Sequence, residues 1–195
     1  MVACDVDNPL CGPRGASAAY GPQKGATAEM ISQLDEALGK YALIAQQATG
    51  KNVMDFPGAG AAGGLGAGLL LFTNAQLRPG VDIVLEIMKF SQLVAKAQLV
   101  ITGEGRTDFQ TAYGKAPVGV AKLAKQYNVP VVCLSGGLAA GADDVLNHGI
   151  NGLLSITALP MTLEECMDNG PALIEAAAAR LCRLLKVGSI LKKNP

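Results

Sequence analysis

A short segment in the second half of the chain brings acidic and basic side chains close together. It reads Gly103-Glu104-Gly105-Arg106-Thr107-Asp108 and directly follows a short apolar run. Carboxylates such as Glu104 and Asp108 hold magnesium, and cations such as Arg106 and Lys115 offset the charge of a phosphoryl group. The segment therefore predicts a site for magnesium and polyphosphate. A turn that only closes its own salt bridge is the alternative.

Two further carboxylates stand near the amino terminus. Asp5 and Asp7 follow an apolar strand predicted over residues 2–4, and Asn8-Pro9 marks a turn. At the end of a strand, Asp5 could accept a proton from a substrate hydroxyl or help to hold magnesium. Strand alternation puts Asp5 and Asp7 on the same side of the chain, so which of them faces a site stays open. Capping of the turn is the alternative.

Two Gly-Pro loops carry the cations Arg14 and Lys24. The loops are Gly12-Pro13-Arg14-Gly15-Ala16 and Gly21-Pro22-Gln23-Lys24-Gly25-Ala26. Arginine offers a planar fork for a carboxylate or phosphate, and lysine offers a point charge. Stiff corners of this kind could direct both cations toward one anionic ligand, or they could simply be turns with exposed cations.

The glycine-rich run at residues 58–68 allows three interpretations. It contains Gly58-x-Gly60-x-x-Gly63, the spacing of a dinucleotide fingerprint, but Pro57 precedes it and no second strand with an acidic end follows. The glycines could instead permit tight helix packing. In the third interpretation the backbone around Gly58, Gly60, Gly63 and Gly64 forms a cradle for an anion.

Composition excludes several classes of function. Lysine plus arginine and aspartate plus glutamate number 16 each, and there are four tyrosines, four phenylalanines and no tryptophan. A nucleic-acid platform or an acidic-membrane partner is therefore not expected. One histidine and five cysteines without CxxC spacing argue against zinc and for reduced thiols in the cytoplasm. The sequence shows no signal peptide and no membrane-spanning stretch.

Short apolar runs that alternate with amphipathic segments predict an α/β fold with a mainly parallel sheet. We expect a helix with Ile31, Leu34, Leu38, Tyr41, Ala45 and Ala48 on its inner face, ending at Gly50. A second helix, over 81–97, is apolar enough to be largely buried. Strands are expected at 99–102, 129–134 and 153–159. A helix begins near Pro117, and a long one near Pro171.

Four blocks in order resemble the glycerate kinase type 1 family. They are residues 3–17, residues 20–26, residues 57–66, and residues 101–111 with Gly114-Lys115-x-Pro117. The likeness extends to about residue 188 and corresponds to the carboxy-terminal half of the family pattern. Met1 leads directly into an apolar strand, so we expect the chain to be part of a longer protein.

The resemblance implies parts of two α/β domains. Residues 1–105 would be the later part of an inserted domain, residues 106–188 the carboxy-terminal part of a flavodoxin-like domain, and residues 189–195 a tail. It also implies ATP-dependent phosphorylation of D-glycerate with Mg²⁺. Asp5, Glu104 and Asp108 would be catalytic, with Glu104 and Asp108 on the metal. The groups expected to bind substrate or phosphate are Asn8, Arg14, Lys24, Gly58, Gly60, Gly63, Gly64, Arg106 and Lys115.

Two other functions stay open. One is a nicotinamide-dependent oxidoreductase that uses the glycine run. The other is a non-catalytic fragment that binds anions or self-associates as a homo-oligomer. The expected partners are small molecules, ATP and D-glycerate, with no nucleic acid and no membrane.

Overall fold

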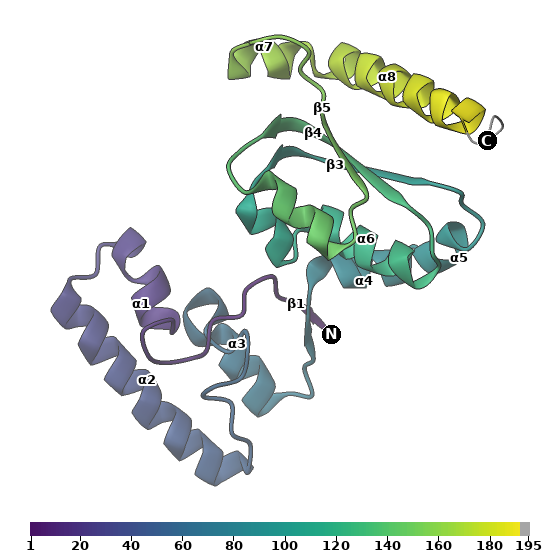
Figure 1. Ribbon diagram of the computed structural model, residues 1–195. Coiled ribbons are helices and arrows are strands. Elements are labelled where there is room, and N and C mark those ends of the chain that lie inside the picture. Colours follow the sequence, from purple (N-terminus) through teal and green to yellow (C-terminus); the bar gives the residue numbers. More distant parts are fainter. Residues whose placement is uncertain (192–195) are drawn as a thin grey trace. The chain divides into compact units, whose positions relative to one another are not determined.

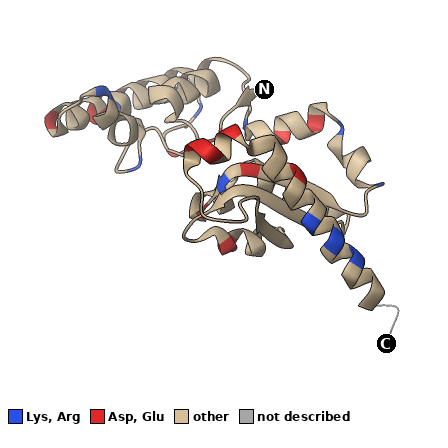
Figure 2. Cartoon of the chain, turned by 90° about the horizontal axis from the view of Figure 1, so that it is seen from above, with Lys and Arg blue, Asp and Glu red and all other residues tan. Residues whose placement is uncertain are grey.

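The computed structural model describes residues 1–191, which divide into two compact units between Ile83 and Val84. Both units combine helices with parallel strands, so the predicted α/β class is confirmed. Figure 2 shows acidic and basic residues interspersed along both units of the described chain. None of the helices within residues 1–191 is both long enough and apolar enough to cross a membrane.

The first unit consists of helices and a minimal two-stranded parallel sheet (Figure 1). Its elements are β1 (Val2–Ala3), α1 (Ala16–Tyr20), the 3₁₀ helix η1 (Pro22–Lys24), α2 (Ala28–Thr49), α3 (Ala61–Phe72), β2 (Leu77–Arg78) and the start of α4 (Gly80–Ile87). In the sheet, Val2 lies opposite Leu77. The unit's buried core is Leu10, Ala42, Ala45, Val53, Ala59, Ala67 and Leu71.

Helix α2 has the predicted ends but a different buried face. The Thr27 hydroxyl accepts from the N–H of Met30, and Gly50 closes the helix in the left-handed conformation at φ 73°. The buried residues are Ala42 and Ala45, whereas Leu34 and Tyr41 are 50% and 45% exposed. The predicted inner face is therefore only partly right: Ala45 is buried and Leu38 packs against the core, whereas Leu34 and Tyr41 are exposed.

Lys51 closes the far end of α3. Its ammonium group donates to the carbonyl oxygens of Leu70 at 3.0 Å, Leu71 at 3.2 Å and Thr73 at 2.9 Å. The last carbonyls of a helix have no partner within the helix, and they carry the negative end of its dipole. Lys51 therefore ties the segment after α2 to the end of α3.

We expect Lys51→Met to destabilise the protein by about 1–2 kcal/mol, because methionine keeps much of the stem but satisfies none of these carbonyls. Urea unfolding followed by circular dichroism measures the change. Lys40→Met is the matched control, since within residues 1–191 Lys40 pairs with Glu36 alone, on the exposed side of α2. Equal stability of the two variants would contradict the capping role of Lys51.

The second unit is a three-layer α/β arrangement. After α4 it contains α5 (Phe90–Val94), β3 (Val100–Thr107), the 3₁₀ helix η2 (Phe109–Tyr113), α6 (Ala116–Gln126), β4 (Val131–Leu138), the 3₁₀ helix η3 (Ala142–His148), β5 (Gly152–Ser155), α7 (Leu163–Asp168) and α8 (Gly170–Leu191). The strands form one parallel sheet in the order β3-β4-β5. Figure 1 shows α8 on one face of the sheet and α6 on the other.

The middle strand, β4, explains this layering. Val131 and Cys133 belong to the apolar cluster that contains Val118 and Ala121 of α6. Val132 and Leu134 point the other way, into the cluster with Ala177 and Leu181 of α8. A strand buried on both faces has no polar alternation, and this explains the continuous apolar run that the sequence shows at 131–134.

The single buried helix predicted over 81–97 is wrong. Helices α4 and α5 are separated at Met88 and Lys89, and Lys89 takes the left-handed φ of 51°. Ile87 and Met88 are exposed, and of the residues of α5 only Val94 is buried. The apolar stripe is present in the sequence, but most of it contacts no core within residues 1–191.

The chain divides into its two compact units between Ile83 and Val84, whereas the resemblance places a domain boundary near residue 105. Strand β3 pairs along its length with β4, so residues 84–105 pack with the second unit. The domain assignment taken from the resemblance remains a prediction about the parent fold. Of the predicted tail, residues 189–191 continue α8, and residues 192–195 lie outside the described residues.

Candidate phosphate and substrate site

The acidic and basic segment lies at the carboxyl end of β3, next to β4. Glu104 is opposite Ser135 and Arg106 is opposite Gly137, so both belong to the paired strand rather than to a free turn. Asp108 follows the last strand residue and is the N-cap of η2. The carboxyl edge of a parallel sheet is where α/β proteins bind their ligands.

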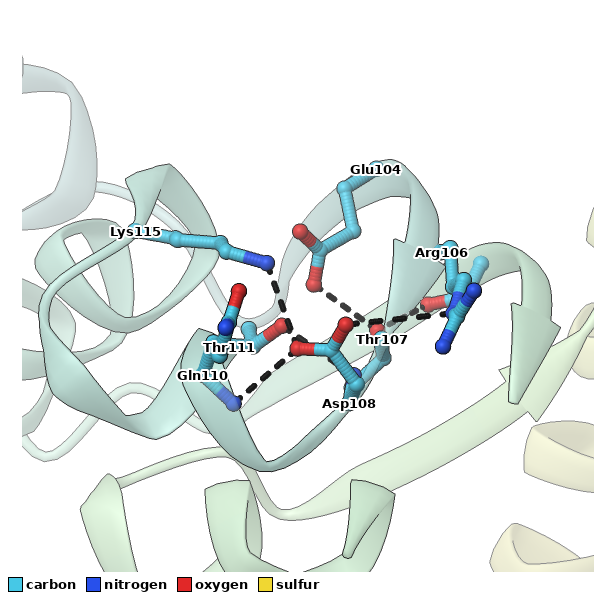
Figure 3. A network of polar contacts seen from close by, with 8 residues as sticks. Glu104, Arg106, Thr107, Asp108, Gln110, Thr111 and Lys115 are labelled. Carbon is cyan, nitrogen blue, oxygen red and sulfur yellow. Dashed lines mark hydrogen bonds and ion pairs between the residues drawn. The ribbon is translucent and has the colours of Figure 1, made fainter. Parts of the chain in front are cut away.

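Asp108 gathers the charges of this segment (Figure 3). Its Oδ1 accepts from Lys115 Nζ at 3.2 Å and from the backbone N–H of Gln110 at 3.0 Å. Its Oδ2 lies 3.8 Å from Arg106 Nε. The side chain of Asp108 is only 15% exposed, against 41% for Lys115 and 71% for Arg106. The two cations are thus held at the strand end with much of their surface open to solvent.

The neighbours of Asp108 set its charge. Burial acts to raise the pKa of this carboxyl, but the hydrogen bond and charge of Lys115, the N–H of Gln110 and the charge of Arg106 outweigh it. The pKa of Asp108 therefore lies below its ordinary value, and the carboxylate is ionised at neutral pH. The stabilisation from this shift is present above the ordinary aspartate pKa and is lost as the pH falls through the lowered value.

We expect Lys115→Gln to raise the pKa of Asp108 toward its ordinary value, because the largest favourable contribution is removed. Titration of the Asp108 carboxyl carbon by NMR measures the shift. Lys122→Gln, on the exposed side of α6, should leave that titration unchanged. An unaltered Asp108 titration in Lys115→Gln would show that Lys115 does not set the charge of Asp108.

Glu104 is the second carboxylate of the segment. Its Oε1 accepts from Thr107 Oγ1 at 2.8 Å, and Figure 3 shows the carboxylate turned toward Thr107 and the Lys115 ammonium. Within residues 1–191, no three His, Cys, Asp or Glu side chains are grouped to hold a metal ion. Glu104 and Asp108 together offer two carboxylates, and one or two carboxylates are what proteins commonly contribute to a magnesium ion that also binds substrate phosphates and waters.

Asp5 is exposed, and its Oδ1 accepts from the backbone N–H of Gly80, the first residue of α4, at 2.7 Å. Asp7 is paired with Arg14, with 2.9 Å between Oδ2 and Nη2. The second oxygen of Asp5 has no hydrogen-bond partner within residues 1–191. Asp5 therefore has both a structural contact and an available acceptor atom. It remains the first candidate for the group that accepts a proton from a substrate hydroxyl.

Asn8 connects three segments of the first unit. Its side-chain N–H donates to Arg14 O at 2.8 Å, and its Oδ1 accepts from the Tyr20 hydroxyl at 2.9 Å. Its backbone carbonyl accepts from the N–H groups of Gly58 and Gly60 at 3.2 and 3.0 Å. Asn8, predicted as a binding residue, thus makes contacts that position the Arg14 corner against the glycine run.

The glycine run uses most of its own N–H groups internally. Those of Gly58 to Ala61, Gly63 and Gly64 all donate to carbonyl oxygens of the first unit. No strand leads directly into the run, because the preceding element is helix α2, so the context of a dinucleotide fingerprint is absent within the described residues. The structure instead shows close packing, since a Cβ on Gly60 would stand 2.2 Å from the Pro9 carbonyl oxygen. Binding of an anion by these glycines remains a prediction.

Lys24 lies at a pocket of about 600 Å³ inside the first unit. The lining is mainly apolar and comes from α1, η1, α2 and the kinked start of α3: Ala16, Ser17, Tyr20, Gly21, Lys24, Gly25, Ala26, Met30, Gln33, Leu34, Leu38 and Gly63. Lys24 is the only charged residue of this lining, and within residues 1–191 its ammonium group has no ion-pair partner. Such a pocket favours an anionic ligand with an apolar part.

Sequence reasoning missed several residues that hold these groups in place. Asp35 of α2 accepts the N–H of Gly12 with both carboxylate oxygens at 3.0 Å. Tyr20 holds Asn8, and the buried Thr107 and Ser135 lie behind Glu104. A hydroxyl inside an apolar strand, as at Ser135, is the only one of these signals that the sequence carries, since a buried polar group needs a partner.

The parallel sheet and the charged strand end define an α/β protein with a cluster of charged side chains at the carboxyl edge of its strands. The chain belongs to the glycerate kinase family, whose sequence pattern matches residues 1–186. This confirms the resemblance to the glycerate kinase family.

The relatives agree with this assignment. The chain is 54% identical over 181 residues to the glycerate kinase of Halalkalibacterium halodurans, which covers 93% of this chain and 48% of the relative. It is 47% identical over 190 residues to the glycerate kinase of Bacillus subtilis, covering 97% and 50%. It is 43% identical over 187 residues to the glycerate 2-kinase of Escherichia coli, covering 96% and 49%.

A solved structure is also similar. The crystal structure of a protein from Salmonella typhimurium LT2, assigned as glycerate kinase 2, superimposes with a TM-score of 0.77 at 45% identity. The match covers 96% of this chain and 48% of that one. The chain therefore spans about half the length of the relatives and of the structure it matches.

Proposed function

We propose that this chain forms part of a glycerate kinase that transfers the terminal phosphoryl group of ATP to D-glycerate. The observation that carries the proposal is the family match over residues 1–186 together with the Asp108, Lys115 and Arg106 cluster at the end of β3. In phosphoryl transfer the protein mainly positions the reactants and compensates charge, which is what fixed cations at a strand end can do.

In this proposal Lys115 and Arg106 bind the phosphates. Asp108 holds both cations, and its lowered pKa keeps it ionised so that they stay in place. Glu104 contributes a carboxylate toward nucleotide-bound Mg²⁺, with Asp108 as a second ligand. A bound Mg²⁺ would neutralise part of the phosphate charge.

The first unit would bind the acceptor. Asp5 accepts the proton of the attacking glycerate hydroxyl, whose oxygen forms the new bond to phosphorus while the bond to ADP breaks. Arg14 and Lys24 attract the glycerate carboxylate and the phosphates. Asn8 and the glycines at 58, 60, 63 and 64 shape the floor beneath them.

The wider assignments taken from the resemblance belong to this proposal. The chain would correspond to the carboxy-terminal half of the enzyme, with residues 1–105 in the inserted domain and residues 106–188 in the flavodoxin-like one. It would act in the cytoplasm on small molecules, without nucleic acid or membrane. Assembly into a homo-oligomer is a further possibility that sedimentation tests.

Two measurements test the proposed function. Calorimetry of this chain with magnesium-ATP and with D-glycerate asks whether either reactant binds. A coupled assay of ADP release then uses this chain joined to the segment of the Halalkalibacterium halodurans relative that it does not cover. We expect ADP release that depends on D-glycerate and is absent with glycerol, which lacks the carboxylate. A joined protein that folds but never releases ADP would refute the proposal.

The same preparation tests the oxidoreductase alternative. NADH fluorescence on titration should stay unchanged, because the glycine run lacks the strand that a dinucleotide site requires. Quenching at micromolar protein, without binding of ATP, would reverse the preference.

A further inference from the structure

A network of hydrogen-bonded, buried polar side chains lies behind Glu104. Thr107 at the end of β3 and Ser135 on β4 are both 0% exposed, and Cys133 is 1% exposed. The hydroxyl oxygens of Thr107 and Ser135 are 2.6 Å apart, and Cys133 Sγ is 3.5 Å from Ser135 Oγ. The network ends at the Glu104 carboxylate, which is partly open to solvent.

The hydrogen bonds of this network all run in one direction, toward Glu104. Each hydroxyl has one hydrogen to donate. Thr107 gives its hydrogen to the carboxylate of Glu104, so in the short contact with Ser135 it must be the acceptor. Ser135 therefore donates to Thr107, and the Cys133 thiol is left to donate to Ser135. Aligned bonds of this kind polarise one another and reinforce the last bond, the one to Glu104.

The arrangement fixes one carboxylate oxygen and leaves the other available. Oε1 of Glu104 receives the Thr107 hydroxyl, and within residues 1–191 no donor contacts Oε2. An unrestrained glutamate samples many rotamers, which costs free energy when it must bind a ligand in one of them. Holding Oε1 from behind would present Oε2 at the strand end in a single orientation.

We propose that Thr107 and Ser135 are positioning residues that orient Glu104 toward the nucleotide-bound cation. The inference rests on the proposed function for the role of Glu104, and on buried geometry for the positioning itself. Apolar residues would fill the same core positions without the need to satisfy two buried hydroxyls, so a simple packing role does not account for them. No buried side-chain polar atom within residues 1–191 lacks a hydrogen-bond partner, so every hydroxyl of this network is satisfied.

The test compares Thr107→Val, which has a similar shape but no hydroxyl, with Thr107→Ser, which keeps the hydroxyl. The first readout is the order of the Glu104 side chain, measured by carbon-13 relaxation of its methylene groups. We expect Glu104 to become mobile in Thr107→Val and in Ser135→Ala, and to stay ordered in Thr107→Ser. The second readout is magnesium-ATP affinity by calorimetry, which should fall about tenfold in Thr107→Val and recover in Thr107→Ser.

The matched control is Thr157→Val. It removes the hydroxyl that lies 2.7 Å from Ser155 Oγ near the end of β5, a pair that does not contact Glu104. If Glu104 stays as ordered in Thr107→Val as in the unchanged chain, the positioning role is wrong. If Glu104 loosens while magnesium-ATP binding is absent or unaffected, the positioning role stands and the proposed role of Glu104 fails. Should Thr107→Val unfold, Ser135→Ala measured against Ser135→Thr gives the same comparison.

Discussion

Gly60→Ala is expected to unfold the amino-terminal unit, with a loss of about 3 kcal/mol or more. A Cβ at this position would stand 2.2 Å from the carbonyl oxygen of Pro9 and 3.2 Å from that of Asn8. The backbone of Gly60 has φ −75° and ψ −8°, which alanine adopts without strain. The effect is therefore purely steric, and it falls on backbone atoms that have no rotamer to move away.

Hydrogen exchange measures this prediction directly, because protection should be lost across residues 1–83 and kept in the sheet of the second unit. Gly68→Ala is the matched control, since Gly68 lies in helix α3, which begins directly after Gly60, and a new Cβ there would meet no atom within 4 Å. Alanine there should stabilise the helix by about 0.5–1 kcal/mol. If both variants showed equal protection, the close approach of Gly60 to the Asn8-Pro9 backbone would be wrong.

Asp5→Asn is expected to lower the turnover of the joined, full-length protein by about 10²- to 10⁴-fold, the range that general base catalysis supplies. Asparagine keeps an oxygen that can accept the N–H of Gly80, so the contact at the start of α4 survives and only the charge is removed. The thermal stability and the glycerate KM should change little.

The contrast with Asp7→Asn separates the two carboxylates. That substitution removes an exposed ion pair with Arg14, which contributes little to stability and leaves Asp5 intact. We expect Asp7→Asn to retain most of the turnover. Unchanged turnover in Asp5→Asn would remove Asp5 from the mechanism, and a selective loss in Asp7→Asn would reassign the base.

Local signals in the sequence predict the ends of elements well. Gly50 ends α2 and Pro117 lies in the first turn of α6, both as expected. Each signal depends on contacts within a few residues, which a sequence contains in full. The parallel sheet follows for the same reason, since the run at 131–134 is apolar on both faces.

Burial was harder to predict than secondary structure. The stripe that includes Leu34 and Tyr41 and the stripe over 81–97 have the right periodicity, yet much of each is exposed in the described chain. Periodicity finds an apolar face but does not say which neighbour covers it. On α2 the core cluster contains Ala42 and Ala45, together with Ala67 and Leu71 of α3.

The site shows the same division. The charges at Glu104, Arg106, Asp108 and Lys115 are visible in the sequence, and the structure brings them together at one strand end. The internal acceptors of the glycine run and the donors behind Glu104 depend on partners far away in the chain, such as Asn8 and Ser135. Sequence spacing alone contains no information about these long-range partners.

The contacts of Asn8 have a mechanical consequence for the first unit. Asn8 donates to the carbonyl of Arg14 and accepts from the N–H groups of Gly58 and Gly60. The loop that carries Arg14 and the glycine-rich run at residues 58–68 are therefore coupled. An anion that draws Arg14 away from Asp7 would also displace the glycine segment through Asn8, whose side-chain amide binds Arg14 and whose backbone carbonyl binds Gly58 and Gly60. Ligand entry should therefore displace the two segments together, and Asn8→Ala should let each respond separately.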